Sequence, residues 1–354
     1  MRRPAYDSPS VPINWDRIDY VSGHNEAVYV RPDAMPTILE FYKKNPEEAA
    51  KEFGDNPYEL KNILEHWVRS PKEDLQMIPT DSIVIKLDKE AIKRSGMLTR
   101  DSIPEYMHIS LKGKRVLYKS ELMMLEMLAE ANWERPIYIA VSVGPENQLN
   151  MGNHFIQEGL TYRFTPFDTD KLGVKIDSEK MYDNLMHKFK FGGIDKPGIY
   201  IDENAMRMCH SHRRIFSQLA QQLIREGKKD KAKAALDYAE KMIPAFNVPY
   251  DWQNGAVQMA EAYYQLGDST KADDMMKALA DKAVEYLTWY LSMDDNRFSI
   301  STREFEYHWA VLDAEVKIMK KYNSKLAEIY APKVEELYNL YAERYERLQK
   351  MEKK

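Results

Sequence analysis

The chain has 354 residues and a formal net charge of −5, with 44% hydrophobic and 30% charged residues. This length is enough for two domains with cores of their own, and the composition is ordinary for a folded soluble protein. Nucleic-acid-binding proteins usually carry a basic stripe, so the acidic balance argues against nucleic acid as a partner. The only cysteine is Cys209, which excludes an intrachain disulfide.

No segment of the sequence has the character of a signal peptide or a membrane span. Arg2 and Arg3 are not followed by an apolar stretch, as a signal peptide would require. The longest apolar run, residues 136–143, is far too short to cross a bilayer. We therefore expect a chain that is neither exported by its own signal nor membrane-spanning, or one that is a piece of a longer polypeptide.

Residues 1–78 are predicted to be an extended connector followed by short helices. Prolines recur over the first half of this stretch, and proline fixes φ and removes a hydrogen-bond donor. Asn45 and Asn56 each precede a proline, which places asparagine at a helix N-cap and proline at the first helical position. Gly54 would end the first of these helices.

Residues 79–175 change to the alternating period of strands and are predicted to form a small α/β domain. Strands are expected at residues 83–87, 136–143 and 160–164, a hairpin at 107–111 with 115–118, and a helix capped by Ser120. The strand at 136–143 is almost continuously apolar, so we expect it to be buried on both faces.

Residues 176–354 are predicted to be entirely helical, which gives an α+β fold. The pattern G-x-x-x-K-A occurs at residues 227–232 and again at 267–272, each time between two apolar helices. Ala220 and Ala260 lie where the helices of one hairpin would approach closely. This pattern resembles the tetratricopeptide repeat of about 34 residues, with residues 247–252 as a lengthened connection. A plain helical bundle with coincidental glycines and alanines is the alternative.

A tetratricopeptide-like array would present a concave groove lined by the first helix of each repeat. Such a groove suits a protein or peptide partner, unless the chain's own C-terminal helices fill it. The predicted groove residues are Arg214, Ser217, Gln221, Asn254, Val257, Glu261 and Tyr264.

The sequence gives no catalytic constellation, metal site or cofactor motif. Cys209, His210 and His212 are crowded on one helix start without a second cluster, whereas zinc sites need well-spaced ligands. Cys209 has no identifiable base, and His154 and His187 are isolated. We therefore expect no catalytic residue, metal or cofactor in this chain.

Several stretches resemble the C-terminal soluble region of a bacterial family of large membrane proteins. They are residues 1–8, 132–138, 158–163 and 207–232. That family is of uncharacterised function and is related to protein O-mannosyltransferases of the GT-C glycosyltransferase class. The resemblance implies a multi-pass membrane region upstream, which would catalyse any sugar transfer, and a periplasmic domain that follows its last membrane helix.

Three hypotheses about function follow. In the first, the chain is the non-catalytic accessory domain of a membrane glycosyltransferase-like protein on the periplasmic side of the inner membrane, and binds a protein partner or a glycan acceptor. Its only link to the membrane would then be the upstream segment. In the second, it is a free-standing cytoplasmic tetratricopeptide-like scaffold. In the third, the α/β part is itself an enzyme acting on carbohydrate.

Overall fold

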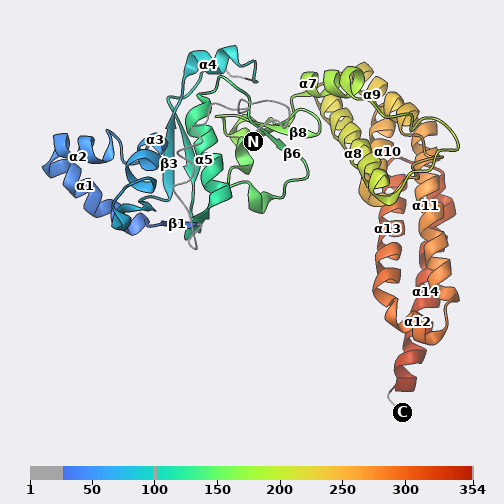
Figure 1. Ribbon diagram of the computed structural model, residues 1–354. Helices are drawn as coiled ribbons and strands as arrows, with labels where there is room; N and C mark the ends of the chain where they lie inside the picture. Colours follow the sequence, from blue (N-terminus) through green and yellow to red (C-terminus); the bar gives the residue numbers. More distant parts are fainter. Residues whose placement is uncertain (1–26, 99–101, 353–354) are drawn as a thin grey trace. The chain divides into compact units, whose positions relative to one another are not determined.

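The computed structural model describes residues 27–98 and 102–352 (Figure 1). The chain divides into two compact units, Met1–Asp177 and Ser178–Lys354. The first combines small sheets with helices and the second is helical in its described residues, which confirms the predicted α+β fold. The predicted connector over residues 1–26 and the family-like stretch 1–8 lie outside the described residues. No helix in the described part of the chain is long and apolar enough to cross a membrane.

The first unit contains three small sheets. Their strand orders are β2-β1-β5, β3-β4 and β6-β8-β7, and β1 pairs parallel with β2 and antiparallel with β5. The strands are β1 (Ala27–Val30), β2 (Met77–Ile78), β3 (Ser82–Lys86), β4 (Tyr106–Ser110), β5 (Val116–Tyr118), β6 (Tyr138–Ala140), β7 (Phe155–Gln157) and β8 (Thr161–Phe164). The helices are α1 (Met35–Lys44), α2 (Pro46–Phe53), α3 (Leu60–Asn62) with a π-helical continuation Ile63–Val68, α4 (Lys89–Arg94), α5 (Lys119–Ala131) and α6 (Thr169–Leu172).

One predicted hairpin is wrong in its pairing. The strands β4 and β5 form where expected, and Gly113 makes the turn between them with φ +87°. However, β4 pairs with β3 over residues 82–86 and β5 pairs with β1. The pairing of β3 with β4 places Ile83 and Ile109 opposite each other in the core. A turn signal is local, whereas the choice of partner is decided by which pairing buries the apolar faces.

The strand predicted at residues 136–143 is shorter and more exposed than expected. Only β6 forms there, at the edge of its sheet, and Tyr138 is 44% exposed. The expectation of burial on both faces is therefore wrong. Pro136 cannot donate to a sheet ladder, and an edge position tolerates it.

Helix starts differ from the prediction where a carboxylate replaces the expected cap. Ser120 lies inside α5, whose start is fixed by the Glu121 carboxylate accepting the backbone N–H of Tyr118 at 3.0 Å. Asn56 is not the cap of a helix: the next helix, α3, starts at Leu60 and has Glu59 as its cap. By contrast, α2 begins and ends as predicted, with Gly54 after it at φ +82°.

Residues predicted to form a connector and short helices contribute to the core of the first unit. Val28, Leu60 and Ile63 are buried in one cluster together with Ile83 and Leu125. Each fully buried aliphatic side chain contributes about 1.5 to 3 kcal/mol. Strand β1 and most buried residues from α3 to β2 are therefore packed with the strands that follow them. A second cluster is formed by Met35, Ile38, Phe53 and Trp67.

The second unit is built from helical hairpins. Its helices are α7 (Ser178–Asp183) with a π-helical continuation Asn184–Lys188, α8 (Glu203–Arg225), α9 (Lys229–Met242), α10 (Ala256–Gln265), α11 (Ser269–Ser292), α12 (Asp295–Ile300), α13 (Thr302–Lys321) and α14 (Leu326–Glu352). A 3-10 turn, Trp252–Asn254, precedes α10. Helix α8 packs against α9 and α10, and α11 packs against α10, α13 and α14 (Figure 1).

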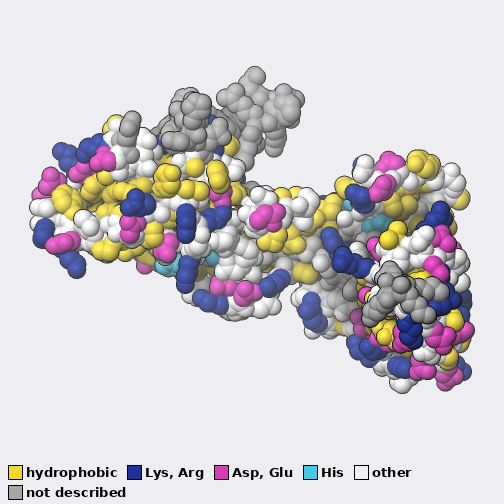
Figure 2. All heavy atoms as spheres, turned by 90° about the horizontal axis from the view of Figure 1, so that it is seen from below, with side chains coloured by type: hydrophobic (Ala, Val, Ile, Leu, Met, Phe, Trp, Pro, Cys, Tyr) yellow, Lys and Arg dark blue, Asp and Glu magenta, His cyan; other side chains and the backbone are white. Residues whose placement is uncertain are grey.

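Small residues allow the close approach of these helices. Gly227 and Gly267 turn the chain between α8 and α9 and between α10 and α11, with φ +75° and +83°. The alanines at the helix contacts have no exposed surface; they are Ala220, Ala232, Ala260 and Ala272. On the face seen in Figure 2, acidic and basic side chains of this unit are interspersed rather than gathered by sign.

Candidate functional site

The structure places the predicted groove residues on α8, on α10 and on the 3-10 turn before α10. Ser217, Val257 and Tyr264 are buried, with 1%, 2% and 8% exposure, and α8 and α10 pack directly on one another. Gln221 spans this contact by donating from Nε2 to the backbone oxygen of Gln258 at 3.1 Å. The accessible members are Arg214, which is exposed, and Gln221, Asn254 and Glu261, which are partly exposed.

The chain's own C-terminal helices cover one end of the predicted groove. Lys321 at the end of α13 forms an ion pair with Glu261 at 2.9 Å. The ring of Tyr322 stacks on that of Tyr264, with centroids 4.7 Å apart and planes 9° apart. These contacts correspond to the alternative in which C-terminal helices fill the groove, whereas Arg214, toward the other end, is exposed.

The cluster at residues 209–212 has the features of helix packing. Cys209 is 3% exposed, and burial raises the pKa of its thiol, so it stays protonated and a poor nucleophile. His212 lies with Nδ1 2.7 Å from the backbone oxygen of Met208, and its ring meets the edges of Phe189 and Phe191. Among the described residues, no group of three or more His, Cys, Asp or Glu side chains could hold a metal ion.

Two of the family-like stretches meet in a polar network of the first unit whose charged members are buried. Tyr138 donates its hydroxyl hydrogen to Glu158 Oε2 at 2.9 Å, and burial with this hydrogen bond raises the tyrosine pKa. Arg163 lies 3.8 Å from the Glu158 carboxylate and donates to the backbone oxygen of Ser95 at 2.7 Å. Glu158 and Arg163 are 5% and 4% exposed. The network therefore ties β6, β8 and the end of α4 together.

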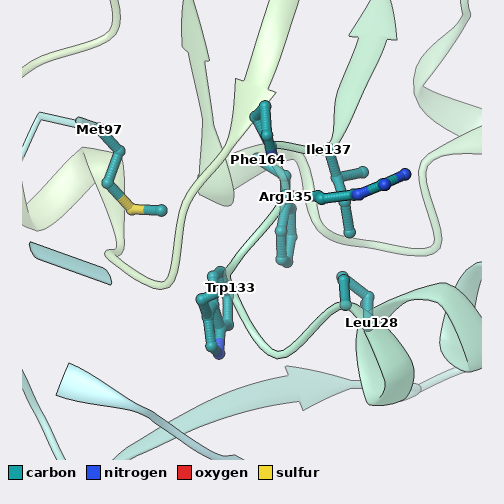
Figure 3. Close-up of a pocket in the computed structure, with 8 residues that line it drawn as sticks. Met97, Leu128, Trp133, Arg135, Ile137 and Phe164 are labelled. Atoms are coloured by element: carbon teal, nitrogen blue, oxygen red, sulfur yellow. The ribbon is translucent and has the colours of Figure 1, made fainter. Parts of the chain in front are cut away.

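The stretch around Trp133 forms a small apolar pocket beside this network (Figure 3). The rings of Trp133 and Phe164 are stacked, with centroids 5.7 Å apart and planes 11° apart. Figure 3 shows Met97 on one side of them, and Leu128 and Ile137 on the other. The space among these side chains is about 10 Å³, room for about one water molecule. This pocket is therefore a feature of the core and too small for a ligand.

A larger cavity lies within the helical unit, between the 3-10 turn before α10, α11 and α13. Its volume is about 380 Å³, within the range of small-molecule sites. It is lined by Asp251, Trp252, Gln253, Leu279, Lys282, Ala283, Tyr286, Tyr290, Tyr307, His308, Val311 and Glu315. Gln253 donates to the Tyr307 hydroxyl at 2.6 Å, and the rings of Tyr286 and His308 stack with centroids 4.4 Å apart.

Glu315 is the unusual residue of this cavity. It has no exposed surface, and neither carboxyl oxygen has a hydrogen-bond partner in the part of the chain that the structure describes. Burial, and to a lesser extent the negative charge of Asp251, raise the pKa of its carboxyl to about 8. Sequence reasoning missed this residue, although a signal existed: a glutamate beside Val311, Leu312 and Val316 on the apolar side of α13.

Comparison with known proteins gives one match. Residues 1–183, which include the Tyr138–Glu158–Arg163 network and the Trp133 pocket, match the family model described as TMEM260-associated domain 2. No curated protein and no solved structure matches the chain. The chain belongs to the TMEM260-associated domain 2 family.

Proposed function

We propose that this chain is the non-catalytic accessory part of a membrane-anchored, glycosyltransferase-like protein, and that it binds a protein partner or an acceptor. The observation that carries the proposal is the family match over residues 1–183, because it links the chain to TMEM260, an O-mannosyltransferase-related membrane protein. The contacts of Glu158 with Tyr138 and Arg163 support an accessory role, since these polar side chains find partners within the fold itself.

The helical unit would supply the binding surface. We propose that α8 with α9 and α10 with α11 are two tetratricopeptide-like repeats, supported by the equivalent turns at Gly227 and Gly267 and by the buried alanines. A protein or peptide segment would then lie at the end of the groove near Arg214 and Gln221. The second kind of partner that this surface would bind is a glycan carried by such an acceptor.

The proposed location is the periplasmic side of the inner membrane, as part of a larger protein. Attachment to the membrane would come from a segment outside this sequence. The test is a fractionation blot of cells of the source organism with an antibody against this chain. A membrane-bound band much larger than the 41.5 kDa of this chain supports the proposal. A soluble band of the chain's own size would contradict it and favour a free-standing cytoplasmic scaffold.

The accessory role is tested separately in the full-length gene. Deleting the region that encodes this chain should lower sugar transfer to the acceptor while leaving hydrolysis of the sugar donor in membranes unchanged. Loss of both activities, with the membrane part still inserted and folded, would place catalytic groups in this chain and overturn the proposal.

A further inference from the structure

The cavity between α11 and α13 contains more acid than base. Of the described residues in its lining, Lys282 is the only lysine or arginine, and its ammonium already contacts Asp251 at 3.2 Å and the backbone oxygen of Tyr250 at 3.4 Å. The second carboxyl, that of Glu315, has no such partner. A buried carboxyl without a donor costs about 1 to 3 kcal/mol or more, so a group that supplies donors there would be stabilised.

The other side chains that line the cavity do not remove this excess of acidic over basic groups. Among the described residues that line the cavity with Glu315, Lys282 is the only permanent cation, and burial lowers the pKa of His308, which disfavours its charged form. The titratable and charged side chains of this lining are Asp251, Lys282, Tyr286, Tyr290, Tyr307 and His308, and the Glu315 carboxyl also acts on Tyr330 of α14.

The walls of the cavity are aromatic. Tyr286, Tyr290, Tyr307 and Trp252 all line it, and Tyr286 and Tyr307 are 37% and 42% exposed, so their rings are within reach of a ligand entering from solvent. Aromatic faces attract cations, most strongly where water is excluded. The ammonium of Lys282 already shows this preference, lying 6.0 Å from the centre of the Tyr286 ring.

We propose that this cavity is a binding site for an organic cation, a primary ammonium group, with Glu315 as its counter-ion and the tyrosine rings as its walls. The inference stands on the cavity and does not depend on the proposed accessory function. A metal ion fits less well, because two carboxyls are fewer ligands than structural or catalytic metal sites provide.

Binding is coupled to loss of one proton. Near pH 7 the Glu315 carboxyl is protonated, because burial raises its pKa to about 8. An arriving ammonium favours the ionised carboxylate, so the O–H bond of Glu315 breaks and the proton passes to solvent. The ammonium group of the ligand keeps its own protons, and its N–H groups donate hydrogen bonds to the carboxylate. Because the carboxyl has almost no exposed surface, the side chain must turn toward the cavity as the ligand enters.

The test is calorimetric titration of the full chain near pH 7 with three matched probes. These are the methylamide of Nα-acetyl-lysine, n-butylammonium, and the methylamide of Nα-acetyl-norleucine, which has a similar shape without the charge. The two cations should bind and the norleucine compound should not. Repeating the titration in phosphate and in HEPES should reveal release of about one proton per cation bound.

Variants assign the binding to Glu315. Glu315→Gln keeps the shape and should weaken both cations at least tenfold, about 1.4 kcal/mol, with no proton release. Glu285→Gln is the matched control, because Glu285 is an exposed glutamate of α11 outside the cavity lining. Tyr286→Leu should weaken the cations by about threefold, and it provides an independent test if Glu315→Gln folds poorly.

Several outcomes would overturn the proposal. One is equal binding of the lysine and norleucine compounds, and another is unchanged affinity and proton release in Glu315→Gln. A third is binding of an uncharged hydroxylated probe, methyl α-glucoside, where the cations do not bind. If the cations bind as expected, a tighter lysine compound identifies the source as a polypeptide side chain. Tighter n-butylammonium identifies a free small amine.

Discussion

The guanidinium carbon of Arg213 lies 5.0 Å from the centre of the Tyr250 ring, inside the helical unit. Arg213 has no exposed surface and donates to three backbone oxygens of the segment between α9 and α10. The acceptors are Ile243 at 2.9 Å, Val248 at 2.7 Å and Pro249 at 3.2 Å. One side chain of α8 therefore bonds to three points along the connection between the two hairpins.

Arg213→Met should destabilise the helical unit strongly. The variant keeps much of the side-chain volume but removes the donor from three carbonyl groups, two of which are buried, at a cost of at least about 2 kcal/mol. Urea unfolding followed by helical circular dichroism measures this cost. Arg214→Met is the matched control: Arg214 is exposed, so this change should shift the free energy of unfolding by less than about 0.5 kcal/mol. Equal effects of the two variants would contradict the structural role of Arg213.

Gly255→Ala should be far more costly than the same change at Gly227. Gly255 has φ +86°, and an added Cβ would lie 2.6 Å from Arg214 Cα, a backbone atom that cannot move aside. The combined strain and overpacking should cost about 2 to 4 kcal/mol.

Gly227 serves as the matched control for this substitution. It has φ +75° with no atom within 4 Å of the added Cβ, so alanine there should cost only about 1 kcal/mol. Thermal unfolding of both variants checks the difference. Similar losses at the two positions would mean that α8 and α10 can separate at their ends to make room.

Sequence reasoning succeeded where structure depends on nearby residues. The end of α2 at Gly54, the turns at Gly227 and Gly267, and the strand near Ile83 each follow from a few neighbouring residues. It failed where the partner is distant: the turn at Gly113 is real, but its two strands pair elsewhere.

The candidate site could be predicted only in part, for a related reason. Its cavity is formed by three segments, with Asp251 before α10, Lys282 on α11 and Glu315 on α13. No local sequence pattern predicts that these segments lie together. The predicted groove residues do lie on α8, on α10 and on the turn before α10, but a sequence does not show how closely α8 and α10 approach. That approach is what buries Ser217 and Val257.

Arg163→Met should loosen the sheet of β6, β8 and β7. The change removes the hydrogen bond to the Ser95 carbonyl and leaves the buried Glu158 carboxylate without its cationic neighbour, which should cost about 3 kcal/mol. Hydrogen exchange of peptides covering residues 136–165 should become faster. Tyr138→Phe removes only one hydrogen bond of the same network and should cost about 1 kcal/mol. Unchanged exchange in Arg163→Met would show that the network is not needed to hold the sheet.

The pH dependence of stability should change when Glu315 is replaced by glutamine. The folded-state pKa of Glu315 is about 8, above its ordinary value of 4.5, so the folded chain retains a proton that the unfolded chain loses. The contribution of this retained proton to the free energy of unfolding is fully present below pH 4.5 and is lost as the pH rises to about 8. Glu315→Gln does not titrate, so its free energy of unfolding relative to the parent chain should rise by about 2 to 4 kcal/mol between pH 5 and pH 8 and then level off.

Urea unfolding of both proteins at several pH values measures this difference, with Glu285→Gln as the control that should follow the parent chain. The cation proposed for the cavity would reverse the effect, because it binds the ionised carboxylate and stabilises the folded parent chain most at high pH. With n-butylammonium present, the gap between Glu315→Gln and the parent chain should therefore narrow above pH 7. A gap independent of pH would show that Glu315 ionises in the folded chain as easily as in the unfolded one.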